Sequence, residues 1–134
     1  TYSGHPVSCA VALKTLELYE RWDIAAQVAD VGPYFQKKLR AFKERPFVGD
    51  ARGVGLVGAL EFVSNKKTKE GFGAVGAGGA AIDRACREEG LIIRPLGDTI
   101  AFCPPLVITR DEIDELFARF SRALDKAEPQ LSVN

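Results

Sequence analysis

Two short, glycine-containing connections constrain the fold of this 134-residue chain more than any other feature. Each separates two short segments with the composition of β-strands. The connections are RGVG at residues 52–55, between 47–50 and 56–63, and PLGD at residues 95–98, between 91–93 and 99–102. Connections this short join only antiparallel strands, because a parallel pair needs a crossover of about a dozen residues or more. The sequence therefore predicts two β-hairpins, with proline and glycine at the tip of the second.

Four longer segments carry helix signals. They are residues 5–22, 24–45, 76–89 and 109–129, the second being stopped by Pro46. Asp23 can cap the second segment, and Thr109 with Glu112 forms a capping-box pattern at the start of the fourth. Apolar residues recur every three or four positions along the second segment, on both sides of Gly32-Pro33. This spacing predicts one helix kinked at the proline or, alternatively, two helices in register.

These elements predict an α+β fold, with three or four strands of mostly antiparallel sheet covered on one face by helices. A chain of this length can bury one core, so residues 1–134 are expected to form a single domain. The segment 7–22 is apolar on more than one side. We therefore expect it to be buried against something larger than one sheet, and we expect the chain to associate with itself.

Composition excludes several classes of protein and site. Eighteen Lys and Arg residues balance eighteen Asp and Glu residues, which is not the charge of a nucleic-acid or anionic-membrane binder. No apolar run is long enough to span a bilayer. Cys9, Cys86 and Cys103 are spaced too widely for a disulfide framework or a zinc site, and we predict buried thiols in a reducing compartment. His5 is the only histidine, so no multi-histidine metal site and no convincing Ser-His-Asp triad is predicted.

Two GxGxxG patterns occur, at residues 53–58 and 71–76. A dinucleotide site needs this pattern after a strand and before a helix, whose first amides then meet the pyrophosphate. The first pattern runs on into a strand, whereas the second follows a charged loop but does precede a helix. Glycines that serve turns are the commoner cause of such patterns, so we predict turns at both places, with a phosphate site as the alternative.

Arg94 is the most distinctive candidate for a binding residue. It follows three apolar residues and precedes Pro95, so its stem must lie along the sheet while its guanidinium finds a partner. A structural ion pair is the commoner role for such a residue. The alternative is an anchor for a carboxylate, which the planar guanidinium can bind through two hydrogen bonds. The hydroxyls of Thr1 and Ser3, just before the first helix, can likewise be ordinary caps or can bind an oxyanion or phosphate.

Three segments extend these interpretations. TYSGHPVSCAVALKTLELYE, RGVGLVGALEFV and GLIIRPLGDTIAFCPPLVITRDEIDEL, in this order, resemble the C-terminal small domain of class III aminotransferases, which are pyridoxal-phosphate enzymes of fold type I. The resemblance covers nearly the whole chain, and RPLGD is similar to the ω-amino acid:pyruvate branch. It implies transfer of an amino group between an amino acid or amine donor and a keto acid such as pyruvate. It also implies a cytoplasmic homodimer or higher homo-oligomer, in which residues 1–22 link this domain to the large domain.

The resemblance implies two site residues. Thr1 matches the threonine that hydrogen-bonds the phosphate of the pyridoxal phosphate held by the neighbouring subunit. Arg94 matches the arginine that pairs with the α-carboxylate of an amino or keto acid and moves aside for amines. This agrees with the carboxylate alternative reached from the position of Arg94. No metal ligand and no catalytic residue is implied within this chain.

The resemblance also indicates what this sequence lacks. In the family, the lysine that forms the Schiff base with the cofactor belongs to the large domain, and no lysine here matches it. Together with the start at Thr1, this predicts a fragment that neither transaminates nor holds the cofactor by itself. Two alternatives remain open: a stand-alone binding module that keeps the fold without the chemistry, or part of a decarboxylase or aminomutase of the same family.

Overall fold

The structure is a computed structural model, and it describes residues 3–131. Its elements are, in order, α1 (Pro6–Arg21), α2 (Ile24–Ala41), the short 3-10 helix η1 (Phe42–Glu44), β1 (Val48–Val54), β2 (Val57–Phe62), α3 (Ala77–Glu88), β3 (Arg94–Leu96), β4 (Thr99–Phe102) and α4 (Arg110–Leu131). The strands form one antiparallel sheet with the order β1-β2-β4-β3. The predicted α+β fold is therefore confirmed. Among residues 3–131, no helix is long and apolar enough to cross a membrane.

The first hairpin has a shorter turn than the sequence predicted. Strand β1 continues to Val54, so only Gly55 and Leu56 separate it from β2. Gly55 has a φ of 56°, a left-handed conformation that glycine adopts without strain. The connection predicted at residues 52–55 is therefore mostly strand.

The second hairpin also differs from its prediction, in a way that concerns the candidate site. The strand predicted at residues 91–93 is wrong, because β3 begins at Arg94 and only Gly97 and Asp98 separate it from β4. Arg94 therefore lies within a strand and not after one. Pro95 is tolerated there because β3 is at the edge of the sheet, where a missing N–H removes no ladder hydrogen bond.

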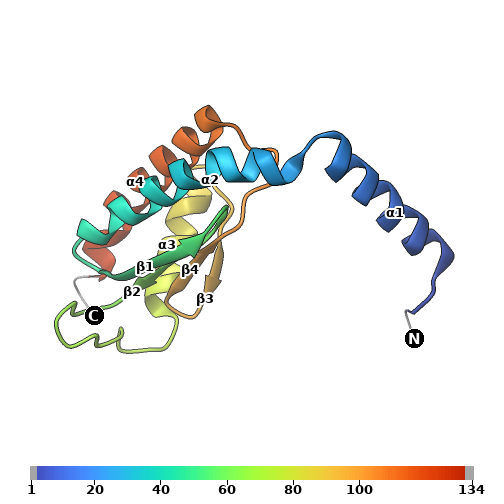
Figure 1. The fold of residues 1–134 in the computed structure, drawn as a ribbon. Coiled ribbons are helices and arrows are strands. Elements are labelled where there is room, and N and C mark those ends of the chain that lie inside the picture. Colours follow the sequence, from blue (N-terminus) through green and yellow to red (C-terminus); the bar gives the residue numbers. More distant parts are fainter. Residues whose placement is uncertain (1–2, 132–134) are drawn as a thin grey trace.

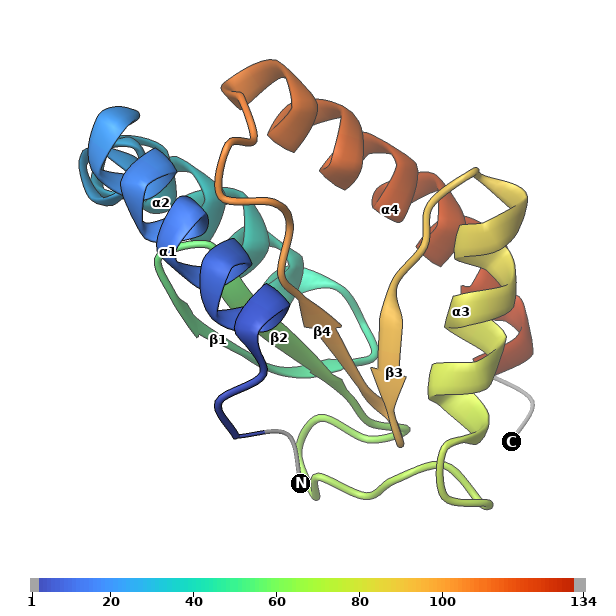
Figure 2. The same cartoon turned by 90° about the vertical axis from the view of Figure 1, so that its right-hand side faces the viewer.

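The core lies between one face of the sheet and the helices. Leu60 on β2 and Ile100 on β4 are fully buried on this face. The ring of Phe102 contacts Phe117 and Phe120 of α4, with ring centroids 5.8 and 4.9 Å apart. Helix α2 packs on β1 and β2, and α3 packs beside α4 and against β3, as Figure 2 shows at the β3 edge. The opposite face of the sheet carries the alternate residues of each strand.

The helix boundaries follow the predicted caps. The Asp23 carboxylate accepts a hydrogen bond from the amide of Ala26 at the start of α2. The Thr109 hydroxyl accepts from the amide of Glu112, whose carboxylate accepts from the amide of Thr109 at 2.8 Å. Helix α2 is one helix that contains Pro33. Helix α4 continues through Pro129 to Leu131, two residues beyond its predicted end.

Helix α1 extends away from the rest of the chain (Figure 1). None of its residues is buried, and large apolar side chains stay exposed, including Val7 at 65%, Leu13 at 69% and Leu16 at 59%. The predicted burial of this segment is therefore not found within residues 3–131. Exposed apolar side chains on several sides of a helix are a typical contact surface for other protein segments.

The prediction of three buried cysteines is wrong for two of them. Cys86 on α3 is buried, and burial, with Asp83 and Glu89 nearby, raises the pKa of its thiol to about 12. Cys9 is exposed because α1 contacts so little of the chain, and Cys103 is exposed just after β4.

Candidate functional site

The register of the sheet places Arg94 at one end of a row of four residues. Arg52 on β1 is opposite Ala59 on β2, which is opposite Ala101 on β4, which is opposite Arg94 on β3. Directly opposed residues point to the same face of a sheet. This row lies on the face away from the buried Ile100, since side chains alternate along each strand. An arginine therefore stands at each edge of this face, with two small side chains between them.

Arg52 forms ion pairs with two carboxylates of the same sheet. Its Nη1 atom lies 3.0 Å from a carboxylate oxygen of Asp50 and 2.9 Å from one of Glu61. Hydrogen bonds to these two carboxylates, Asp50 first, raise the pKa of Arg52, and the same contact lowers the pKa of Asp50. Arg52 is therefore already neutralised by its own neighbours.

Arg94 has a different environment. Its side chain is exposed and makes no hydrogen bond or ion pair with any other residue in the range 3–131. The register of the sheet explains this difference. The neighbouring row of paired residues consists of Asp50, Glu61, Thr99 and Leu96. Its two acidic residues lie beside Arg52, whereas Leu96 and Thr99 lie beside Arg94. The guanidinium thus has five N–H donors available for a ligand.

An apolar groove of about 370 Å³ adjoins Arg94. It is lined by residues of β3, of β4, of the segments that precede and follow them, and of α4: Leu91, Ile92, Ile93, Arg94, Ala101, Phe102, Cys103, Pro104, Pro105, Ile108 and Leu116. Arg94 is the one cationic side chain among these described lining residues. Small-molecule sites of this kind have apolar walls and few polar groups. The arrangement suits a small molecule with a carboxylate at one end.

The predicted alternative of a phosphate site at residues 71–76 is not supported. The amides of Gly76 and Gly79, at the start of α3, both donate to the carboxylate of Asp98, each at 3.0 Å. A carboxylate of the chain itself therefore occupies the donors that a phosphate would need. The pattern at residues 53–58 spans the end of β1, the turn and the start of β2, so it does not open a helix.

The sequence interpretation missed Asp98. The sequence contains one signal for such a residue. Helix α3 begins after Gly76, which has no side chain to cap the helix. The exposed donors at such a helix start must be satisfied from elsewhere. Asp98 lies in the turn of the second hairpin, and only the fold brings it to this helix.

Thr1 and the lysines are the residues of this chain that bear on the binding of pyridoxal phosphate. Thr1, the predicted phosphate ligand, lies outside the described residues. Residues 3–131 include every lysine of the sequence, and none of them is buried. A lysine that forms a Schiff base is usually desolvated. In this part of the chain no group of three or more His, Cys, Asp or Glu side chains could hold a metal ion.

Comparisons with known proteins agree with the resemblance. A family model described as aminotransferase class-III matches residues 1–124. The chain is 40% identical over 132 residues to probable gamma-aminobutyrate transaminase 3, mitochondrial, of Oryza sativa subsp. indica. The matched region covers 98% of this chain and 26% of that protein. It is 44% identical over 133 residues to probable gamma-aminobutyrate transaminase 4 of Oryza sativa subsp. japonica. Here the matched region covers 98% of this chain and 28% of that protein.

Solved structures give the same result for the fold. The omega transaminase from Pseudomonas jessenii in complex with PMP is similar, with a TM-score of 0.90 and 37% sequence identity. The similarity covers 96% of this chain and 28% of that one. The chain thus spans between 26% and 28% of the length of these relatives. Since the family model matches most of its residues, the chain belongs to the class III aminotransferase family.

Proposed function

We propose that this chain is the C-terminal small domain of an aminotransferase that transfers an amino group between an amino donor and a keto acid such as pyruvate. In this proposal Arg94 binds the carboxylate of the keto acid. The unpaired guanidinium beside an apolar groove supports this role, because the equivalent cation at the other edge, Arg52, is already paired. A two-point contact between guanidinium and carboxylate fixes both the affinity and the orientation of a small substrate.

The cofactor site belongs, in our proposal, to other parts of the enzyme. Class III aminotransferases use pyridoxal phosphate, yet no lysine of this chain is buried. The Schiff-base lysine is therefore supplied by the large domain, and Thr1 contributes to phosphate binding across a homodimer interface. The exposed apolar side chains of α1 support a contact with the large domain or with a second subunit. The relative from Oryza sativa subsp. indica is named mitochondrial, so the cytoplasmic location stays a prediction.

Steady-state kinetics of the complete enzyme test the role of Arg94. We expect Arg94→Ala to lower kcat/KM for pyruvate by roughly tenfold to a hundredfold, because a charge-assisted contact contributes about 1.5–3 kcal/mol. The value for isopropylamine, a donor without a carboxylate, should change little. Arg52→Ala is the matched control and should leave the ratio of the two values unchanged. Equal losses for both substrates in Arg94→Ala would refute the role.

A further inference from the structure

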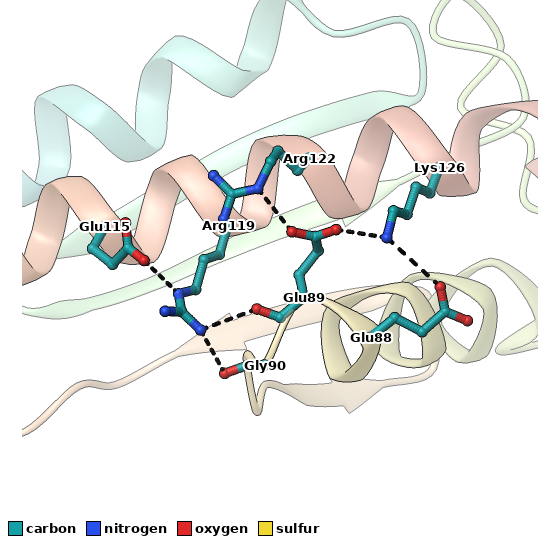
Figure 3. A network of polar contacts seen from close by, with 7 residues as sticks. All are labelled: Glu88, Glu89, Gly90, Glu115, Arg119, Arg122 and Lys126. Carbon is teal, nitrogen blue, oxygen red and sulfur yellow. Dashed lines mark hydrogen bonds and ion pairs between the residues drawn. The ribbon is translucent and has the colours of Figure 1, made fainter.

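The segment that carries Arg94 is attached to helices at both of its ends. At the first end, Arg119 of α4 donates hydrogen bonds to the carbonyl oxygens of Glu89 and Gly90, at 3.1 and 3.4 Å. The carboxylate of Glu89 also contacts Arg122 and Lys126, as Figure 3 shows. At the second end, the turn of residues 97–98 lies on the start of α3. Arg94 lies between these two attachments.

Asp98 makes the second attachment. One of its carboxylate oxygens accepts from the amide of Gly76 and the other from the amide of Gly79. These are the two donors that a capping box satisfies within a single helix. The backbone of Asp98 is held as well, because its carbonyl oxygen accepts from the amide of Phe62 on β2 at 2.9 Å. Asp98 therefore joins α3, β2 and the second hairpin.

The close fit of the turn against α3 depends on a glycine. A Cβ atom at Gly79 would lie 2.0 Å from the carbonyl oxygen of Gly97, far inside any real contact. Backbone thus touches backbone at this place, and any larger residue would push the turn away from the helix. The contact between turn and helix is therefore specific and tight.

Apart from its contact with α3, strand β3 has little else to fix it. It has three residues, all exposed, and it pairs with β4 alone because it is an edge strand. A short edge strand with one partner is free to shift unless its ends are held. The contacts of Asp98 lie two residues beyond the end of β3.

We propose that Asp98 is a positioning residue: its carboxylate locks the turn of residues 97–98 on α3 and thereby sets where the Arg94 guanidinium meets the substrate carboxylate. This inference rests on the proposed function of Arg94. It predicts a defect that is selective for substrates with a carboxylate, since Asp98 is not among the residues that line the groove.

The test compares Asp98→Asn with Asp111→Asn in the complete enzyme. Asp111 is an exposed acid in the first turn of α4, so it controls for the loss of a negative charge at a helix start. We expect Asp98→Asn to raise KM for pyruvate about threefold to tenfold, with KM for isopropylamine unchanged. Hydrogen exchange of the amides of Arg94 and of residues 96–98 should become faster. Asp111→Asn should change neither quantity.

A second pair of variants tests the contact without changing a charge. Gly79→Ala should displace the turn and give the same selective rise in KM for pyruvate, whereas Gly73→Ala is the control because its Cβ would meet no atom within 4 Å.

If Arg94→Ala is selective for pyruvate but Asp98→Asn behaves like Asp111→Asn, the positioning role is refuted and the proposed function stands. If Asp98→Asn impairs both substrates equally, its role is only structural. If Arg94→Ala itself is not selective, both proposals fail.

Discussion

Arg52 and Arg94 stand at opposite edges of the same face of one sheet and differ in what surrounds them. Arg52 lies beside Asp50 and Glu61 and binds both carboxylates. Arg94 lies beside Leu96 and Thr99, which offer it no charge. The backbone gives the two residues equivalent places, so the difference comes from their neighbours. An arginine that is conspicuous in a sequence becomes a binding candidate when the fold leaves it without a partner.

The largest predicted effect is a loss of stability when the core face of the sheet is altered. Ile100 is fully buried on this face, in the strand next to β3. We expect Ile100→Ala to lower the free energy of unfolding of this chain by about 2–5 kcal/mol, because it leaves a cavity in the core. Thr99→Ala, on the face of the arginines, should cost less than about 1 kcal/mol. Urea denaturation measures both. Similar losses would contradict the division of the sheet into a core face and a binding face.

A substitution at Leu96 converts the surroundings of Arg94 into those of Arg52. Leu96 holds the place relative to Arg94 that Asp50 holds relative to Arg52. In the complete enzyme we expect Leu96→Asp to lower kcat/KM for pyruvate up to about fivefold, since an internal carboxylate competes and an exposed ion pair contributes at most about 1 kcal/mol. Leu96→Asn is the uncharged control. Added salt should reduce the difference between the two variants, and no difference at low salt would contradict the competition.

The smallest predicted effect is a pH dependence of stability that arises from the ion pair of Arg52 and has no counterpart at Arg94. Its hydrogen bond lowers the pKa of Asp50 below the ordinary 3.8, so the pair stabilises the fold fully above that pH and loses its effect as the pH falls through the lowered pKa. Unfolding midpoints measured from about pH 6 to pH 3 should therefore converge for the wild type and Asp50→Asn. Arg94→Ala should shift the midpoint by an amount that does not depend on pH. A convergence there would reveal an acidic partner of Arg94.

The sequence predicted what local patterns determine. The caps at Asp23 and Thr109 end up where the pattern placed them, because a cap depends on residues three positions apart. The antiparallel hairpins also follow from short connections. The unpaired state of Arg94 could not be predicted, since it depends on the register that sets Leu96 and Thr99 beside it.

The two turns were misplaced for reasons of tertiary structure. Gly53 belongs to strand β1, and a Cβ there would lie 2.3 Å from the carbonyl oxygen of Val57 and 2.9 Å from Nε2 of Gln36. That Nε2 atom, from α2, donates to the carbonyl oxygens of Gly55 and Val57. The glycine therefore makes room for a helix side chain, which local composition cannot show. Asp98 was missed for the same reason, because its two amide partners lie about twenty residues away.

The most direct test of the central claim is the binding of a simple carboxylate to the complete enzyme. Propionate should inhibit competitively against pyruvate, and its inhibition constant should rise roughly tenfold or more in Arg94→Ala. In Arg52→Ala the constant should stay as in the wild type, because that arginine is already paired. An inhibition constant that is the same in the wild type and in Arg94→Ala would show that another group binds the carboxylate.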